Sequence, residues 1–175
     1  MNGEVFALTR AAAHGEVWRL WTGHLVHYDF RHLLTNAVAI AVPMSLIDRC
    51  SRRSILVIMA FLAPLISLVL LGDAQFDEYR GASAIALAVW VASALALLRA
   101  QNAGDRHIGA ALIALAIGKL VFETAGAGHL WTEVTPLPLA HVAGAAAGLI
   151  AFLAIRPVRE QATAPLDPAI NTAQY

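Results

Sequence analysis

The sequence predicts an all-α protein whose helices cross a lipid bilayer several times. Of its 175 residues, 59% are hydrophobic and only 14% are charged, whereas soluble domains average about 25% charged residues. The mean hydropathy is +0.65. None of the long apolar runs shows the alternation of a β-strand, and a single spanning segment in lipid must satisfy its backbone hydrogen bonds internally. Helices are therefore expected.

Five apolar runs approach the roughly 20 residues that a spanning helix needs. They cover residues 32–47, 55–71, 79–98, 108–125 and 137–155. Twelve Lys and Arg balance twelve Asp and Glu, so no basic surface indicates a nucleic-acid partner. The single cysteine, Cys50, excludes a disulfide framework.

The arginines predict how the helices are oriented. They gather in residues 48–53, in residues 99–106 and just after residue 155, whereas 72–78 and 126–136 contain no Lys or Arg. Basic loops remain on the cytoplasmic side. The first, third and last spans are therefore expected to begin at the outer face, and the C-terminus is expected to be cytoplasmic.

We expect three regions. Residues 1–31 form an outer-face interfacial segment, 32–156 the transmembrane domain, and 157–175 a disordered cytoplasmic tail that contains several prolines. The interfacial assignment depends on aromatic residues, which are enriched at the headgroup level of membranes. These residues are Trp18, Trp21, Tyr28 and Phe30.

Four polar residues are expected at a similar depth below the outer surface. Ser83 lies one turn into the third run and His141 one turn into the last, while His32 and Asn36 open the first run at i, i+4 spacing and so share a helical face. Polar side chains inside a membrane are costly and indicate function. A nucleophile, a base and two further donors are the components of an acyl-transfer site. Taken singly, each has a structural explanation, such as a serine bonded to its own helix backbone.

Glycines indicate which helices approach closely. Gly144 and Gly148 form a small-x3-small motif, which lets two helix backbones come together. Close approach of this helix to the third run would bring Ser83 Oγ within hydrogen-bond reach of His141. Gly81, two residues before Ser83, is also expected at a packing position.

These motifs resemble the rhomboid family of intramembrane serine proteases, and most closely its rhombosortase branch. The resemblance covers about residues 15–155. It is carried by the lead-in from Trp18 to His27, His27-x4-His32-x3-Asn36, Tyr79-Arg80-Gly81-Ala82-Ser83, Lys119-x3-Glu123 and His141-x2-Gly144-x3-Gly148. The sequence departs from the family pattern at Ala84, where a glycine is usual, and at Leu87, where an aromatic residue or histidine is usual. The family core has six helices, and the first of them is the one missing from the five runs.

The resemblance implies peptide-bond hydrolysis by a Ser83–His141 dyad with no acidic third member and no cofactor. His32 and Asn36 would then be the oxyanion donors. His24 and His27 are candidates for lining a cavity entrance. Lys119 and Glu123 have two interpretations, a local i, i+4 ion pair or a polar border of the substrate path.

The rhombosortase resemblance implies single-pass membrane proteins with C-terminal Gly-Gly anchors as substrates, and either hydrolysis or acyl transfer to an amine. It also implies a multi-pass protein of the bacterial inner membrane whose active site faces the periplasm. Two alternatives stay open. One is a catalytically inactive rhomboid-like binding protein. The other is a metal or haem protein, because imidazole is a common ligand; its candidate ligands are His24, His27, His32 and His141.

Overall fold

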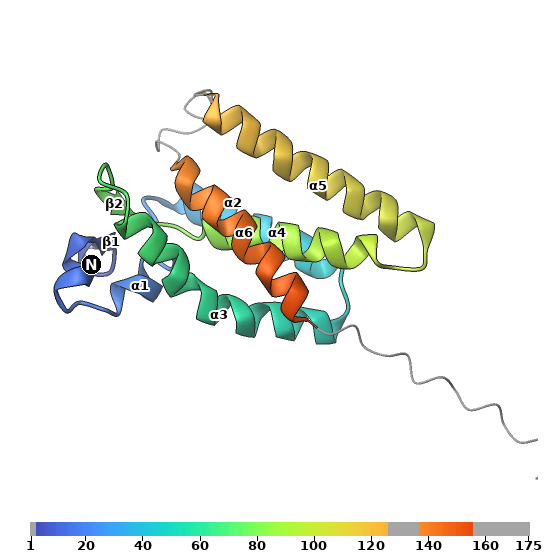
Figure 1. The fold of residues 1–175 in the computed structure, drawn as a ribbon, viewed down its shortest axis with the longest axis horizontal. Coiled ribbons are helices and arrows are strands. Elements are labelled where there is room, and N and C mark those ends of the chain that lie inside the picture. The colour runs from blue at the N-terminus through green and yellow to red at the C-terminus, as the bar shows by residue number, and fades with distance from the viewer. Residues whose placement is uncertain (1–2, 126–136, 156–175) are drawn as a thin grey trace, which may run out of the picture.

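A computed structural model describes residues 3–125 and 137–155, and it is helical throughout its core (Figure 1). The five apolar runs are confirmed as five helices. These are α2 (Phe30–Ser45), α3 (Arg49–Leu71), α4 (Ser83–Leu98), α5 (Ala103–Thr124) and α6 (Pro138–Ala154). By length and composition, α3 and α5 can each cross a membrane, and α4 and α6 are shorter apolar helices. The expected tail at 157–175 lies outside the described residues.

Local sequence signals begin several of these helices. The Asp29 side chain accepts a hydrogen bond from the His32 N–H at 2.8 Å and so caps α2. Asn102 caps α5 in the same way through the Gly104 N–H at 2.7 Å. Each cap satisfies a backbone donor that the first helical turn leaves free. Pro138 is the first residue of α6, where its missing N–H costs no helical hydrogen bond.

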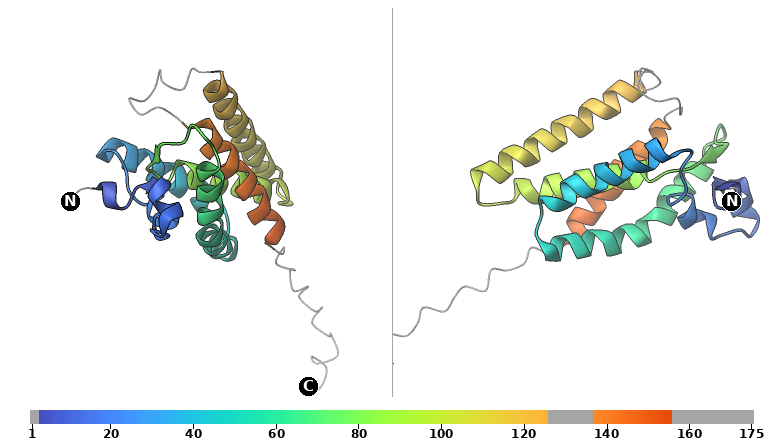
Figure 2. Two further views of the ribbon diagram at one scale, coloured as in Figure 1. Left: turned by 60° about the vertical axis from the view of Figure 1, so that its left-hand side comes forward. Right: turned by 180° about the vertical axis from the view of Figure 1, so that it is seen from behind.

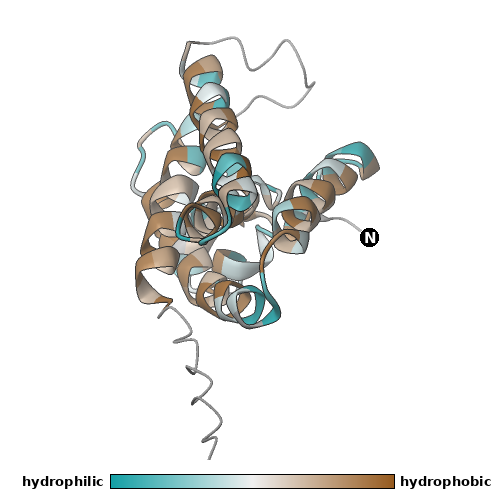
Figure 3. Cartoon of the chain, turned by 90° about the vertical axis from the view of Figure 1, so that its right-hand side faces the viewer, coloured by the Kyte–Doolittle hydropathy of each residue, from teal (hydrophilic) through white to brown (hydrophobic). Residues whose placement is uncertain are grey.

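Helix α4 is the centre of the bundle and contacts α2, α3, α5 and α6. Figure 2 shows α2 and α6 lying along it from different sides. The Trp90 indole of α4 donates a hydrogen bond to the Ala39 carbonyl of α2 at 2.5 Å. Figure 3 shows that most of the helical surface is apolar, as a bilayer requires. In lipid, such helices associate through close packing rather than by exclusion of water.

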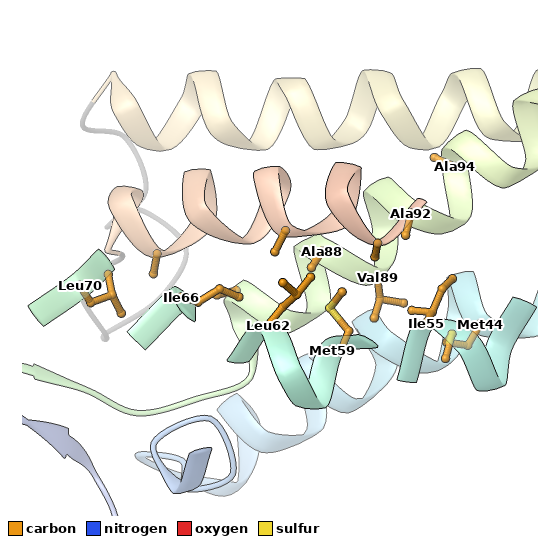
Figure 4. Packing of buried hydrophobic residues seen from close by; sticks show 14 of the residues in the cluster. Met44, Ile55, Met59, Leu62, Ile66, Leu70, Ala88, Val89, Ala92 and Ala94 are labelled. Atoms are coloured by element: carbon orange, nitrogen blue, oxygen red, sulfur yellow. The ribbon is translucent and has the colours of Figure 1, made fainter. Parts of the chain in front are cut away.

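The core joins α3 to α4 with side chains of very different size. Figure 4 shows Met59, Leu62 and Ile66 of α3 beside Ala88 and Val89 of α4. The alanines let α6 pack closely on α4, and the larger residues of α3 fill the remaining space. Small residues at a helix interface allow the van der Waals contact that stabilises a bundle in lipid.

The N-terminal segment folds against the end of the bundle at which α4 begins. Strand β1 (Leu8–Thr9) pairs antiparallel with β2 (Glu78–Tyr79), so that Leu8 lies opposite Tyr79. These strands lie together at one end of the molecule, near the short helix α1 (Arg19–Thr22) (Figure 1). Two 3-10 turns flank β1, at Gly3–Val5 and Arg10–His14. A hydrogen bond from the Gly81 N–H to the Gly23 carbonyl at 3.0 Å also joins the N-terminal segment to the turn before α4.

This pairing corrects the expected start of the third helix. Residues 79–82 are not helical, and Ser83 is the first residue of α4 rather than lying one turn inside it. Tyr79 belongs to β2, and Gly81 has a φ of +125°. That φ ends helical geometry, and residues with side chains rarely adopt it. Gly81 is the local signal for this break, whereas the pairing of Tyr79 depends on a strand far away in sequence.

The aromatic residues expected at the membrane interface are exposed in the structure. Trp18, Trp21, Tyr28 and Phe30 all present large apolar area outside the bundle. The Trp21 indole also donates to the Ala60 carbonyl of α3 at 2.9 Å. The segment is therefore attached to the bundle although much of its aromatic surface is exposed.

Candidate active site

Ser83 lies at the N-terminal end of α4, where the chain leaves the turn at Gly81. Its hydroxyl is 3.5 Å from the Tyr79 hydroxyl, and the same Tyr79 oxygen accepts a hydrogen bond from the Ala84 N–H at 3.2 Å. Tyr79 is buried and is held by the β1–β2 pairing. The candidate nucleophile is therefore positioned by a segment that the N-terminal strand fixes.

His32 and Asn36 lie directly against the turn that precedes Ser83. A Cβ placed on Gly81 would come within 2.6 Å of His32 Cε1, 2.8 Å of His32 Nε2 and 3.3 Å of Asn36 Nδ2. Only glycine fits there, both for space and for its positive φ. The i, i+4 spacing on α2 thus places both side chains on the face turned to α4.

His141 makes a contact that the sequence analysis missed. Its Nδ1 lies 2.6 Å from Glu123 Oε2, and both side chains are buried. The other carboxylate oxygen, Oε1, pairs with Lys119 Nζ. The expectation that no acidic residue accompanies the base is therefore wrong, since α5 supplies a carboxylate to His141. A carboxylate inside an apolar helix signals a partner, but the sequence does not reveal which neighbouring helix provides it.

Several buried polar atoms at the end of the bundle where α4 begins lack a hydrogen-bond partner among the described residues. They are His141 Nε2, His32 Nδ1 and Asn36 Nδ2. No hydrogen bond joins Ser83 to His141 in this part of the chain, because Nε2 is unpartnered and Nδ1 is bonded to Glu123. Buried polar groups are nearly always paired, so each exception requires an explanation. A binding site awaiting a polar ligand is one such explanation.

The backbone around Ser83 has a free donor of its own. The Ala82 N–H donates to His27 Nε2 at 3.3 Å, and the Ala84 N–H donates to Tyr79. Within the described residues, no hydrogen bond occupies the Ser83 N–H. The first N–H groups of a helix have no partner inside it, and together with the helix dipole they favour negative charge.

His27 lies beside the turn that precedes Ser83. Its ring is 5.1 Å from the His32 ring, and its Nδ1 faces the Leu25 carbonyl at 3.2 Å. Burial lowers the pKa of His27, so the ring is favoured in the neutral form. Nδ1 then donates to Leu25 while Nε2 accepts from Ala82. The structure therefore gives His27 the role of supporting the turn.

His24 does not line an entrance, contrary to expectation. It is buried, and its Nε2 lies 3.1 Å from the Ala63 carbonyl and 3.0 Å from Ser67 Oγ, both in α3. Its ring also meets the Tyr79 ring edge-on at 5.3 Å. Burial lowers the pKa of His24 to about 4. His24 therefore attaches the outer segment to α3 as a neutral side chain.

The four histidines considered as metal ligands have different partners. His24 is bonded to α3 and His141 to Glu123, while the rings of His27 and His32 lie against each other. In the described ranges, no group of three or more His, Cys, Asp or Glu side chains is arranged to hold a metal ion.

The chain was compared with protein families, curated proteins and solved structures. The sequence model of the Rhomboid domain matches residues 14–157, which is most of the chain. Neither a curated protein nor a solved structure matches it. Rhomboid proteins are generally intramembrane serine proteases that act on membrane-protein substrates within the bilayer. With its apolar helices and this match, the chain is a membrane protein, and it belongs to the rhomboid family.

Proposed function

We propose that this protein is an intramembrane serine endopeptidase in which Ser83 is the nucleophile and His141 the general base. The observation that carries the proposal is the set of unpartnered polar atoms at the end of the bundle where Ser83 lies: the His141 Nε2 acceptor, the Asn36 Nδ2 donor and the free Ser83 N–H. A base and oxyanion donors near a nucleophile make up the minimum machinery of acyl transfer.

The chemistry follows from these groups. Ser83 Oγ attacks the scissile carbonyl carbon while its proton passes to His141 Nε2, and the carbonyl electron pair moves onto oxygen. The Ser83 N–H, Asn36 and His32 donate to that oxyanion. The tetrahedral intermediate collapses as the C–N bond breaks, and His141 returns the proton to the leaving amine. Water then attacks the acyl-enzyme while His141 accepts its proton; the bond between the acyl carbon and Ser83 Oγ breaks, His141 returns the proton to Oγ, and the new carboxyl terminus leaves.

The nucleophile must move slightly to begin this sequence. In the present structure the Ser83 hydroxyl lies near Tyr79 and is not bonded to His141. Catalytic hydrogen bonds are often long before substrate binds and shorten in the complex. Rotation about the Ser83 Cα–Cβ bond changes the direction of Oγ without moving the backbone.

We propose single-pass membrane proteins as the substrates, and C-terminal Gly-Gly anchors as the preferred class. Two small residues allow the extended chain to approach the turn at Gly81, where His32 and Asn36 lie close to the backbone. Hydrolysis would release the protein at the outer face. An amine that replaces water at the acyl-enzyme would instead receive the acyl group.

The orientation and regions expected from the sequence are part of this proposal. Arginines in residues 48–53 and 99–106 favour a cytoplasmic location for those loops. The site at the start of α4 would then open toward the periplasmic side of a bacterial inner membrane. Residues 1–31 would lie in the headgroup region and 32–156 would span the bilayer.

A catalytically inactive rhomboid-like binding protein is the second candidate, and the missing Ser83–His141 hydrogen bond favours it. Such a protein would use the same site to hold a membrane segment without cleaving it. A fluorophosphonate probe separates the two candidates, because it modifies only an activated serine.

The deciding experiment reconstitutes the full chain in liposomes with a Gly-Gly-anchored reporter and, separately, an ordinary rhomboid-type reporter. We expect cleavage by the wild type and none by Ser83→Ala or His141→Ala, with membrane insertion unchanged. Ser93→Ala is the matched control, because Ser93 is a buried serine of the same helix, ten residues beyond Ser83. Equal turnover by Ser83→Ala and the wild type would refute the serine mechanism. Preference for the ordinary reporter would refute the Gly-Gly assignment alone.

A further inference from the structure

Glu123 holds a position from which it can control the protonation of His141. Its side chain is only 7% exposed, and each of its two oxygens has a different partner. Lys119 Nζ, on the same helix and 45% exposed, pairs with Oε1. His141 Nδ1 of α6 lies 2.6 Å from Oε2. The two contacts leave the carboxylate paired on both sides.

The charges determine which atoms carry protons. Lys119 can only donate, and its positive charge keeps the adjacent carboxylate of Glu123 ionised. An ionised carboxylate can only accept, so the 2.6 Å contact requires a proton on His141 Nδ1. In the neutral ring the lone pair is then on Nε2. Nε2 is the buried atom that has no partner in the described structure.

We infer that Glu123 is a positioning residue, which holds His141 in the tautomer that can accept the Ser83 proton. The inference rests on the proposed serine mechanism and extends it from two residues to three. When Ser83 Oγ bonds to the carbonyl carbon, its proton moves to Nε2 and the ring becomes an imidazolium. The Glu123 carboxylate stabilises that charge through the Nδ1–H hydrogen bond and takes up no proton itself.

Glu123 also fixes the orientation of the His141 ring. Leu87 of α4 cannot donate, accept or stack as an aromatic residue or histidine would, so it does not align an imidazole ring. Glu123 approaches His141 from α5 instead, on the opposite ring nitrogen from the one that must face Ser83. The hydrogen bond limits rotation of the ring about its Cβ–Cγ bond. The carboxylate thus sets both the orientation and the tautomer.

Lys119 makes the substitution Glu123→Gln unusually informative. Because its ammonium only donates, Lys119 would bind the amide oxygen of the glutamine. The amide NH₂ would then face Nδ1 and donate to it, which forces the proton onto Nε2 and removes the base. Glu123→Ala leaves both tautomers accessible. If Glu123 were needed only for packing, Glu123→Ala would lose more activity than Glu123→Gln, since Gln preserves the volume of Glu and Ala does not.

The test measures kcat and KM for the full-length protein in liposomes, using the Gly-Gly-anchored reporter. We expect Glu123→Gln to lose about 10²- to 10⁴-fold in kcat with KM unchanged, and to be at least as impaired as Glu123→Ala. Asp105→Asn is the matched control, the same chemical change near the other end of α5, and should behave as the wild type. If Glu123→Gln is as active as the wild type, or milder than Glu123→Ala, the inference is overturned while the serine mechanism stands.

A second measurement does not depend on turnover. The ¹⁵N resonances of labelled histidines report which ring nitrogen is protonated, and the His141 signals are assigned by their loss in His141→Ala. We expect an Nδ1–H ring in the wild type and an Nε2–H ring in Glu123→Gln. If the wild type cleaves nothing, the proposed function fails, and this spectrum still decides the inference. An Nε2–H ring in the wild type overturns it.

Discussion

Gly144 of α6 lies against the backbone of Ala84 in α4, so closely that a Cβ on Gly144 would come within 2.9 Å of the Ala84 carbonyl carbon. One turn later, a Cβ on Gly148 would come within 3.0 Å of the Ala88 carbonyl carbon. Both glycines therefore lie where α6 approaches α4 most closely. This contact places His141, one turn before Gly144, at the same end of the bundle as Ser83.

The contact predicts that Gly144→Ala destabilises the protein by about 1–3 kcal/mol, because the added methyl forces two backbones apart. Cleavage of the reporter should fall with it. The measurement is thermal unfolding in detergent. Gly118→Ala is the matched control, since Gly118 is also helical but has nothing within 4 Å of its Cβ position. It should be neutral or slightly stabilising, because alanine favours helix over glycine. Equal melting temperatures for Gly144→Ala and the wild type would show that the helices do not pack this closely.

Asn36→Ala should lower kcat by about 10²–10³-fold with little change in KM, since an oxyanion donor acts mainly on the transition state. The Asn36 amide is buried and its Nδ2 is unpartnered in the described structure, so its removal breaks no hydrogen bond of that atom. Steady-state kinetics in liposomes measure the effect. Thr35→Val is the control, because Thr35 is exposed one residue away and bonds only its own helix at Arg31. An Asn36→Ala enzyme of unchanged rate would remove Asn36 from the mechanism.

The burial of His24 predicts that the protein loses stability in mild acid. The histidine titrates near pH 6.5 when unfolded, and burial lowers its pKa to about 4 in the folded protein. Between these values the unfolded chain binds a proton that the folded chain does not, so stability is complete above pH 6.5 and falls toward pH 4. A shift of about 2.5 units corresponds to about 3 kcal/mol. Unfolding in detergent across this range measures it.

Two variants test whether His24 causes this acid sensitivity. His24→Gln should flatten the dependence of stability on pH between 6.5 and 4. His107→Gln, which changes an exposed histidine of α5, should retain it. The same slope in His24→Gln and the wild type would assign the sensitivity to other groups.

The sequence alone predicts much of the architecture because lipid imposes simple rules. Apolar runs of sufficient length must be helices, and each of the five runs contains one. Gly144 and Gly148 could be interpreted as a packing surface because only small residues permit backbone contact. Asn36 and His32 could be placed on one face because helical periodicity requires it.

Tertiary structure decided where α4 begins, where His24 lies and what Glu123 contacts, because these features depend on contacts between distant segments. Pairing of Leu8 with Tyr79 keeps the residues before Ser83 out of α4, and although Gly81 indicates a break, no local pattern identifies the distant strand. His24 looks like an entrance residue in sequence, but the distance to Ser67 shows that it is bonded to α3. The i, i+4 spacing within one helix predicts a pair between Glu123 and Lys119. Only the rotation and approach of α5 and α6 brought its second oxygen to His141, because helix rotation is set by packing and not by spacing within one helix.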